Sequence, residues 1–150
     1  MIEYKEETFD QVIDEIKPLL ENHYEEIALD RDVIKLNPDY ETYKKLCDSG
    51  VMKIITARDD GKLVGYLIAI IKYHLHYKDS LTAIDDIFYV DKEYRKGLTG
   101  VKLFIKTEEI LKKYGVQRVI LNTKLHHDVG AIFDRLGYKE TERVFTKIIG

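Results

Sequence analysis

Residues 85–100 read DDIFYVDKEYRKGLTG and hold the most informative pattern in the chain. The apolar part of this stretch, up to Val90, predicts the end of a β-strand, and helical periodicity follows from about Thr99. Gly97 and Gly100 lie in the turn, where the missing Cβ lets the backbone approach another group closely. Unpaired N–H groups and the helix dipole at a helix start favour an anion. The stretch therefore predicts a strand, a glycine-bearing turn and a helix that suit a phosphate group.

Basic side chains surround this turn, because Lys92, Arg95, Lys96 and Lys102 lie within it or beside it. Their positive charge would attract the same anion that the helix start favours. An ordinary strand-to-helix turn, in which the glycines only allow a tight path, explains the same residues without a ligand. Taken alone, the turn leaves both interpretations open.

Tyr94, Arg95 and Gly100 match a known signature, and in them the chain resembles the GNAT superfamily of N-acetyltransferases. In that family an aromatic-Arg pair precedes a Gly-x-Gly turn that holds the pyrophosphate of coenzyme A. The turn comes directly after the strand that holds the pantetheine. Leu98 stands where the family has its first Gly, and Gly97 lies one residue early. The resemblance therefore does not specify the backbone path of this turn.

The resemblance extends over about residues 51–140, in the family's order and spacing. Residues 60–65, DGKLVG, resemble the hairpin into the family's long central strand. Residues 132–138, IFDRLGY, resemble its C-terminal segment. Several coupled motifs make a stronger signal than a lone Gly-x-Gly turn would.

Hydrophobic periodicity divides the chain into helices and strands. Thr8 and Gln11 have capping-box spacing at the start of the first helix, and Pro18 inside its apolar stripe predicts a kink or a restart. Asp60-Gly61 predicts a two-residue hairpin turn, and residues 78–80, KDS, a polar turn. The expected elements are helices from residue 8 and over 38–48, 99–114 and 128–136, and strands over 51–58, 63–73, 81–90, 116–122 and 138–149.

This order, a helical start, an antiparallel meander and then strand–helix–strand, predicts a single α+β domain over residues 1–150. The resemblance implies the GNAT (acyl-CoA N-acyltransferase) fold, a mixed and mostly antiparallel sheet with splayed central parallel strands, flanked by helices. In the family, the strands equivalent to residues 81–90 and 116–122 splay apart, and acetyl-coenzyme A lies in the gap.

The resemblance also implies which residues bind acetyl-coenzyme A. Backbone groups of Phe88, Tyr89 and Val90 would pair with pantetheine amides, and an N–H there would polarise the thioester carbonyl. A fixed donor of this kind stabilises charge that develops during attack. The further residues implied are Arg95, Lys96, Gly97, Leu98, Thr99, Gly100 and Val101 at the turn, Asn122 after the next strand, and Phe133 on the last helix.

Two acids, Asp85 and Asp86, interrupt the apolar strand before the turn. The attacking amine must be neutral, yet a lysine-like amine has a pKa of about 10.4, so a carboxylate that removes its proton would help. By alignment on Val90 and Arg95, Asp86 stands where several relatives carry this base, and Asp85 is the second candidate. Strand alternation predicts Asp86 on the same face as Phe88 and Val90. A residue that caps a bulge and a solvated acid are the structural alternatives.

Many family members use a Tyr on the last helix to protonate the leaving thiolate, and the matching residue here is Phe133, which cannot do so. Because a thiol has a pKa of about 8.5, the thiolate can leave with the help of solvent. Tyr138, His126 and His127 are neighbouring candidates for this acid. Core packing for the Tyr, and polar loop positions for the two His, are the alternative roles.

The N-terminal third of the chain is acidic: residues 1–50 hold 14 acidic and 6 basic residues, and the remainder 13 and 18. In the family, the region after the first helix walls the acceptor pocket, so the resemblance implies His23 and Glu26 as candidates for substrate binding. An acidic wall would favour a cationic amine, and two solvated surfaces of opposite sign are the alternative.

Other classes of protein find little support. The chain has no long uncharged apolar run, no export signal and no dense basic patch, so we expect neither a membrane nor a nucleic acid as partner. The single Cys47 cannot form an internal disulfide, which agrees with a cytoplasmic location. His74 and His76 have no third ligand nearby in the sequence, so no metal is expected.

The sequence therefore predicts an N-acetyltransferase that moves an acetyl group from acetyl-coenzyme A to a primary amine. One alternative is a GNAT-like module of weak or no activity that binds coenzyme A or a protein partner. Another is an enzyme that uses a different acyl donor. The identity of the acceptor and the oligomeric state, a homodimer included, stay open.

Overall fold

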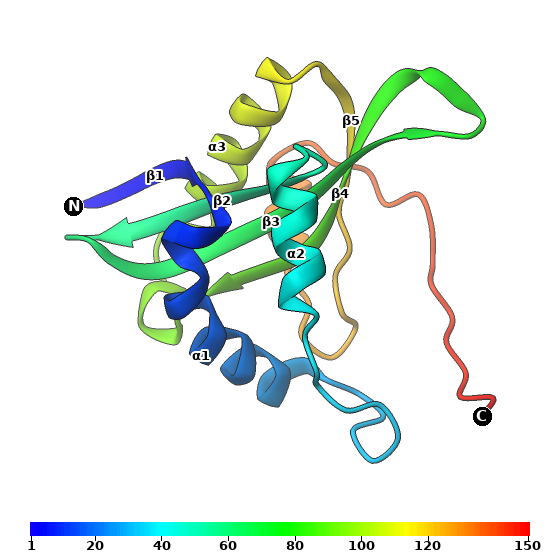
Figure 1. Cartoon of the computed structure of the whole chain (residues 1–150), viewed down its shortest axis with the longest axis horizontal. Coiled ribbons are helices and arrows are strands. Elements are labelled where there is room, and N and C mark those ends of the chain that lie inside the picture. The colour runs from blue at the N-terminus through cyan, green and yellow to red at the C-terminus, as the bar shows by residue number, and fades with distance from the viewer.

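The computed structural model describes residues 1–150 as a five-stranded sheet with helices on both faces (Figure 1). The strands lie in the order β1-β2-β3-β4-β5, and neighbours are antiparallel except β4 and β5, which are parallel. The predicted α+β fold with a mixed, mostly antiparallel sheet is confirmed. The strands are β1 (Ile2–Glu7), β2 (Met52–Asp59), β3 (Lys62–His74), β4 (Tyr77–Val90) and β5 (Val116–Ile120).

Two helices cover each face, so the sheet separates two hydrophobic cores. One face carries α1 (Phe9–Ile27) and α2 (Tyr40–Asp48), and the other carries α3 (Thr99–Lys113) and α4 (Gly130–Arg135). A short 3-10 turn, Lys92–Tyr94, precedes α3. The core under α3 and α4 includes Ile55, Leu67, Leu103, Phe104 and Phe133, and the core under α1 and α2 includes Val12, Leu20, Tyr66, Ile68 and Tyr89.

Local signals at two chain reversals are confirmed. The side chain of Thr8 accepts a hydrogen bond from the Gln11 N–H, and the Gln11 side chain accepts one from the Thr8 N–H, which completes the capping box. Asp60 and Gly61 have φ of 46° and 90°, as a two-residue hairpin turn with both central residues in the left-handed region requires.

The expected restart at Pro18 does not occur, because α1 continues through it to Ile27. Buried side chains on both sides of the proline, Val12, Ile16 and Leu20, hold the two halves of the helix against the same core. Tertiary packing of the apolar stripe therefore outweighs the hydrogen bond that a proline removes from a helix.

The edges of the sheet differ from expectation in three places. Residues 2–7 form β1, which the sequence pattern missed because four of its six residues are charged. Residues 78–80 lie within β4, and the chain turns at Leu75-His76 instead. The predicted strand over 138–149 is absent, and these residues carry no ladder hydrogen bonds. At the first two sites, pairing of the backbone rather than burial of side chains sets the strand ends.

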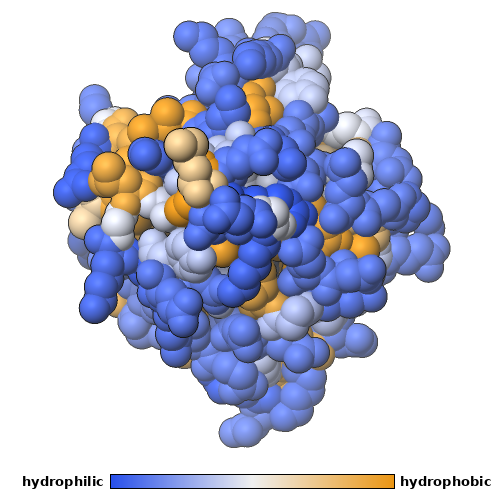
Figure 2. Space-filling model, turned by 90° about the vertical axis from the view of Figure 1, so that its left-hand side faces the viewer, coloured by the Kyte–Doolittle hydropathy of each residue, from blue (hydrophilic) through white to orange (hydrophobic).

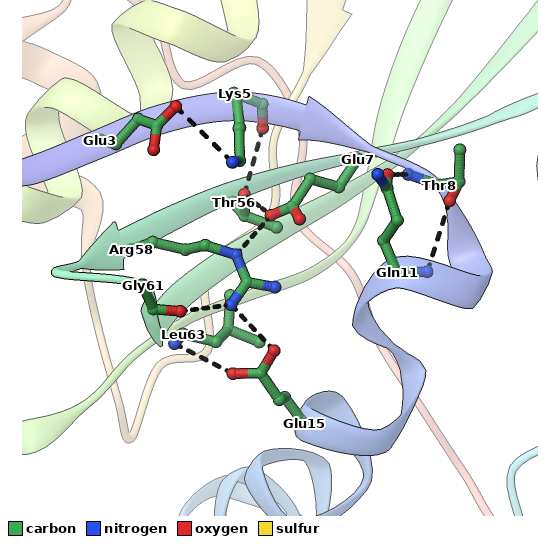
Figure 3. Close-up of polar contacts among 10 residues, drawn as sticks. All are labelled: Glu3, Lys5, Glu7, Thr8, Gln11, Glu15, Thr56, Arg58, Gly61 and Leu63. Carbon is green, nitrogen blue, oxygen red and sulfur yellow. Dashed lines mark hydrogen bonds and ion pairs between the residues drawn. The ribbon is translucent and has the colours of Figure 1, made fainter.

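A buried ion pair joins β1, α1 and the β2–β3 hairpin (Figure 3). The Arg58 Nε donates to Glu7 at 2.8 Å, and one terminal nitrogen donates to Glu15 and to the Gly61 carbonyl, each at 2.8 Å. Arg58 and Glu7 are almost wholly buried. Burial acts to raise the pKa of Glu7, but hydrogen bonds from Arg58 and Thr56 outweigh it, so the pKa lies below its usual value. Glu7 is therefore charged, and its buried carboxylate is stabilised by Arg58.

Replacement of Arg58 by Met should lower the free energy of unfolding by about 3–5 kcal/mol, because it leaves a buried carboxylate without its partner. Urea unfolding at pH 7 measures this loss. Lys45→Met is the control, since the pair of Lys45 with Glu41 is exposed and should contribute less than about 1 kcal/mol. Equal losses in the two variants would show that the Arg58 network adds no more than a surface pair.

Candidate active site

The parallel strands β4 and β5 separate at one end of the sheet. They pair from Leu81 with Val116 to Ile84 with Ile120, and β4 then continues to Val90 without a partner on that side. A cleft of about 770 Å³ opens where they part. It is lined by the unpaired end of β4, the turn before α3 and the start of α3, the end of α1, the loop between β5 and α4, α4 itself, and Val144 and Thr146 of the C-terminal segment. Backbone groups on this edge of β4 lack a sheet partner and can bind a ligand, although the Val90 carbonyl already accepts a hydrogen bond from the Arg95 side chain.

A β-bulge in β4 places the two neighbouring acids on opposite faces of the sheet. Ile68 pairs with Ile87 but Ala69 pairs with Asp85, so Asp86 is the extra residue. The prediction that Asp86 shares a face with Phe88 and Val90 is wrong, because it did not include the bulge. Asp86 faces α2, whereas strand alternation from Ala83 puts Asp85 on the face of Phe88, Val90 and α3.

Asp85 lies at the point where the strands part. Its Oδ1 accepts hydrogen bonds from the backbone N–H and the side-chain amide of Asn122, both at 3.1 Å. Burial raises the pKa of Asp85, and the two bonds from Asn122 oppose that rise. Asp85 thereby joins the chain after β5 to β4 at the base of the cleft.

Asp86 accepts a 2.5 Å hydrogen bond from the hydroxyl of Tyr43 on α2. Burial, together with the bond to Asp86, raises the pKa of Tyr43, so the hydroxyl stays a donor. The other carboxylate oxygen of Asp86 makes no protein hydrogen bond, and Asp86 lines the cleft. Tyr43 was not predicted as a site residue, because no local motif marks it.

The start of α3 is open toward the cleft. Leu98 stands at the N-cap and has no side-chain group that could satisfy the first helical N–H groups. Gly97, Gly100 and Val101 line the cleft. A Cβ at Gly100 would lie 3.4 Å from Phe88 and 3.5 Å from Ile132, which also line the cleft. The absence of a side chain at Gly100 therefore leaves room in this part of the cleft.

Arg95 is held beside the turn by two partners. Its Nε donates to the Val90 carbonyl at 2.7 Å, and a terminal nitrogen donates to both oxygens of Glu26 at 2.8 and 2.9 Å. The guanidinium also lies over the ring of Tyr89, 5.6 Å from its centroid. Glu26, expected at the acceptor side, thus neutralises the arginine expected to meet the pyrophosphate.

Divergent parallel strands beside an uncapped helix start agree with one family of enzymes. The sequence profile of the acetyltransferase (GNAT) family matches residues 13–138. The chain belongs to the GNAT acetyltransferase family. The match runs from within α1 to Tyr138, so it includes both walls of the cleft. No curated protein sequence matches this GNAT protein.

Solved structures share the GNAT fold with this chain at low sequence identity. An aminoglycoside acetyltransferase from an uncultured soil metagenomic sample, in complex with sisomicin, is 18% identical, with a TM-score of 0.76 over 99% of this chain and 97% of that chain. A ribosomal-protein-alanine N-acetyltransferase from Brucella melitensis biovar Abortus 2308 is 18% identical, with a TM-score of 0.74 over 100% of both chains. A predicted acetyltransferase from Clostridium acetobutylicum, with acetyl-coenzyme A, is 9% identical, with a TM-score of 0.75 over 99% of this chain and 96% of that chain. These matches establish the fold.

His23 of the GNAT domain lies where α1 meets the cleft. Its ring packs on Tyr89 with centroids 5.5 Å apart, and both residues line the cleft. Burial lowers the pKa of His23 to about 4, against an ordinary value of 6.5. His23 is therefore neutral near pH 7, and its nitrogens can accept as well as donate a hydrogen bond.

The buried His23 should make stability depend on pH in one window. Because its folded pKa is about 4 and its unfolded value about 6.5, the unfolded chain takes up a proton first as the pH falls. Its contribution to stability is therefore complete above pH 6.5 and decreases from about 6.5 toward 4. In urea unfolding from pH 7.5 to 4.5, the free energy of unfolding should change less steeply with pH for His23→Gln than for the wild type. His76→Gln, at the exposed β3–β4 turn, should leave the slope unchanged, and equal slopes for wild type and His23→Gln would contradict the assignment.

Four expected cofactor residues do not line the cleft. Lys96 and Leu98 are exposed beside the turn, and Thr99 is buried at the start of α3. Phe133 belongs to the core and packs edge-on against Phe104, with centroids 5.3 Å apart. Of the residues implied by the resemblance, the cleft does bring together Phe88, Tyr89, Val90, Arg95, Gly97, Gly100, Val101, Asn122, Asp85, Asp86, His23 and Glu26.

The loop between β5 and α4 supplies lining residues that the sequence analysis did not assign, Thr123, Lys124, Leu125 and Val129. His126 and His127 line the cleft as well, and the His126 ring nitrogen lies 2.8 Å from the Ile27 carbonyl at the end of α1. This contact joins the loop to α1 across the cleft. No local motif in the sequence marks these positions.

Tyr138, a candidate acid, is engaged elsewhere. Its hydroxyl donates to Glu108 of α3 at 2.8 Å, and burial, followed by this bond, raises the pKa of Tyr138. No group of three or more His, Cys, Asp or Glu side chains is close enough to hold a metal ion. None of the helices has the length and hydropathy that a membrane span requires.

Proposed function

We propose that the protein transfers an acetyl group from acetyl-coenzyme A to a primary amine by direct attack. The observation that carries the proposal is the cleft itself, in which the unpaired end of β4, the uncapped start of α3 and the carboxylate of Asp86 border one space. The family match supports the type of reaction. We also propose the cytoplasmic location that the single Cys47 suggests.

The residues at the turn fit the anionic part of coenzyme A. Backbone N–H groups near Gly100 and Val101 would bind a phosphate oxygen, because they lack intrahelical partners. The guanidinium of Arg95 would contribute charge, shared with Glu26. Backbone groups of Phe88 to Val90 would orient the pantetheine, since β5 leaves that edge of β4 unpaired.

Asp86 is the proposed base. A neutral amine nitrogen forms the new bond to the acetyl carbon, the carbon–sulfur bond breaks, and the amine proton passes to Asp86 directly or through a water. The free oxygen of Asp86 can take the proton while Tyr43 holds the other. Solvent protonates the thiolate, because Phe133 has no acidic group and Tyr138 is bonded to Glu108.

Replacement of Tyr43 by Phe should lower kcat on the order of 10-fold while coenzyme A affinity stays the same, because Asp86 loses the donor that orients it. Steady-state rates and calorimetric titration with coenzyme A measure the two effects. Tyr40→Phe, on the same helix and without a bond to Asp86, is the control and should keep the wild-type rate. A Tyr43→Phe protein with unchanged kcat would show that Asp86 needs no positioning by Tyr43.

A cationic amine is the proposed acceptor, such as a polyamine, an amino-sugar, or a lysine or N-terminal amine of a protein. Of the three acids in the cleft, Glu26 pairs with Arg95, whereas Asp85 and Asp86 accept hydrogen bonds from uncharged groups only, so an aspartate such as Asp86 can attract a cation. Two solved relatives are named for acceptors with amines, an aminoglycoside and a ribosomal-protein alanine. Similarity in fold makes these two classes the first to test.

A thiol-release assay with acetyl-coenzyme A and an amine panel tests the proposal. The expected result is release of coenzyme A that requires an amine, with a matching acetylated product in mass spectrometry, and faster rates with cationic than with neutral acceptors. The second candidate is a module that binds coenzyme A without catalysis, which the buried Phe133 favours. Tight coenzyme A binding with no acetylated product from any amine would select that alternative.

A further inference from the structure

The side chain of Arg95 joins three walls of the cleft. Arg95 lies in the turn before α3, its Nε donates to the Val90 carbonyl of β4, and one terminal nitrogen donates to both carboxylate oxygens of Glu26 near the end of α1. All three residues line the cleft. One side chain therefore holds the turn, β4 and α1 together, at the proposed site for coenzyme A.

The Val90 carbonyl belongs to the edge of β4 that faces the gap between β4 and β5. It shares one trans peptide group with the N–H of Asp91, so the two groups point in opposite directions. The Asp91 N–H donates to the Val64 carbonyl of β3 at 2.8 Å. The Val90 carbonyl therefore points away from β3, and Arg95 occupies one of the backbone acceptors proposed for the pantetheine.

Both contacts of Arg95 can be replaced by groups of coenzyme A. A pantetheine amide N–H can donate to the Val90 carbonyl in place of Nε. A guanidinium offers phosphate oxygens the same planar set of donors that it offers a carboxylate, so the pyrophosphate can take the place of Glu26. Glu26 gains no such substitute, because coenzyme A is itself an anion and brings no positive group to a carboxylate.

Glu26 without Arg95 would be a carboxylate with no counter-charge. Its side chain is 15% exposed, and Arg95 is the only residue with which it forms an ion pair. His23, one turn earlier in α1, has its pKa lowered by burial to about 4, so it is neutral near pH 7. The last turn of α1 carries no basic residue, and the helix dipole there also favours a cation. A largely buried carboxylate that loses its partner is costly, and a cation that enters the cleft would remove that cost.

Charged groups on the outer surface differ from this pair. On the side with the β2–β3 hairpin, hydrophilic residues cover most of the surface (Figure 2). In a surface ion pair such as Lys5 with Glu3, the side chains are 42% and 64% exposed. Solvent screens such pairs, so a cation gains little by binding to them. Arg95 and Glu26, 30% and 15% exposed, lie in a cleft, where the attraction between opposite charges is stronger.

We propose that Arg95 exchanges Glu26 for the pyrophosphate of coenzyme A, and that the freed Glu26 carboxylate binds a second ammonium group of the acceptor. The inference rests on the proposed function, in which Asp86 takes the proton of the attacking amine. That amine is neutral when it reacts, so the cation at Glu26 is a different group of the same molecule. Asp86 and Glu26 line one cleft. The acceptor is therefore an amine that carries a second, protonated amine, as diamines and polyamines do.

The exchange couples the two binding events. Coenzyme A and a diamine each take one member of the same ion pair, so each should bind more tightly when the other is present. Calorimetric titration with coenzyme A and an α,ω-diamine measures this coupling without reaction, because free coenzyme A carries no acetyl group. Saturating coenzyme A should lower the Kd of the diamine on the order of 10-fold in the wild type.

Glu26→Gln should remove the coupling and lower the Kd of coenzyme A itself by about 2–5-fold, because a neutral amide holds the guanidinium less firmly than a carboxylate does. Glu25→Gln is the matched control. It removes the same charge from the neighbouring residue, which is 70% exposed and pairs with Arg31, and it should keep both wild-type values. Weaker binding of coenzyme A to Glu26→Gln would show that Glu26 positions Arg95 for the phosphate. That result, or an unchanged coupling, would overturn the exchange.

Initial rates of acetyl transfer test the acceptor class. In the wild type, kcat/KM should be on the order of 10-fold higher for a diamine than for the monoamine of the same chain length. Glu26→Gln should bring this ratio to about two, because a diamine offers two amines, and Glu25→Gln should keep the wild-type ratio. Equal ratios in the wild type and in Glu26→Gln would overturn the proposal. Absence of acetyl transfer to every amine would instead contradict the proposed function, and the calorimetric coupling would still decide the exchange at Arg95.

Discussion

The Gly100→Val protein should lose coenzyme A binding, with Kd raised at least about 100-fold, or ~2.7 kcal/mol. A Cβ at this position already meets Phe88 and Ile132 at ordinary contact distance, so the two added methyl groups must project into the cleft. There they would cover the N–H groups at the start of α3 that we propose for the phosphate. Calorimetric titration with coenzyme A measures the loss.

Leu98→Val is the matched control, because it puts the same side chain into the same turn. Leu98 is exposed and does not line the cleft, so we expect a change in Kd of less than about threefold. Circular dichroism confirms that both variants are folded. A folded Gly100→Val protein with wild-type affinity would contradict the phosphate site at α3. Equal loss of binding in Leu98→Val would show that any change in this turn disturbs the site.

The Asp86→Asn protein should lose on the order of 100-fold or more in kcat/KM while its affinity for coenzyme A stays the same. An amide cannot take the proton of the attacking amine, yet it can still accept the hydrogen bond of Tyr43. The deficit should decrease as the pH rises toward about 10, where more of the amine is already neutral. Rates from pH 6.5 to 9.5 with one amine measure both effects.

Asp85→Asn provides the control in the neighbouring residue. Its Oδ1 can still accept the two bonds from Asn122, so the base of the cleft is kept and kcat should change less than about threefold. Full activity in Asp86→Asn together with a large loss in Asp85→Asn would exchange the roles of the two acids. Equal losses would mean that either change disturbs the divergence of β4 and β5.

The parts of the site that lie in one continuous stretch could be predicted from the sequence. Residues 85–100 encode the end of β4, the turn and the start of α3 in order, so their meeting at one cleft follows from local structure alone. The Asp60-Gly61 turn and the Thr8 cap are equally local, since the residues involved specify the backbone angles or bonds themselves.

Contacts between distant segments could not be predicted. Tyr43 and Asp86 are 43 residues apart, and Glu26 and Arg95 are 69 apart, and neither pair has a local signature. The bulge at Asp86 was not predicted, because side chains were assumed to alternate strictly between the two faces of the strand. Two acids in an apolar strand already suggested an irregularity. Residues 138–149 have the composition of a strand but form no strand, because no neighbouring strand pairs with them. Composition alone does not predict whether such a neighbour is present.

A crystal structure with coenzyme A bound tests the central claim most directly. We expect the pyrophosphate at the N–H groups near Gly100, the pantetheine along the unpaired edge of Phe88 to Val90, and the thiol within reach of Asp86. Coenzyme A bound outside the gap between β4 and β5, or with its thiol on the far side of the sheet from Asp86, would contradict it.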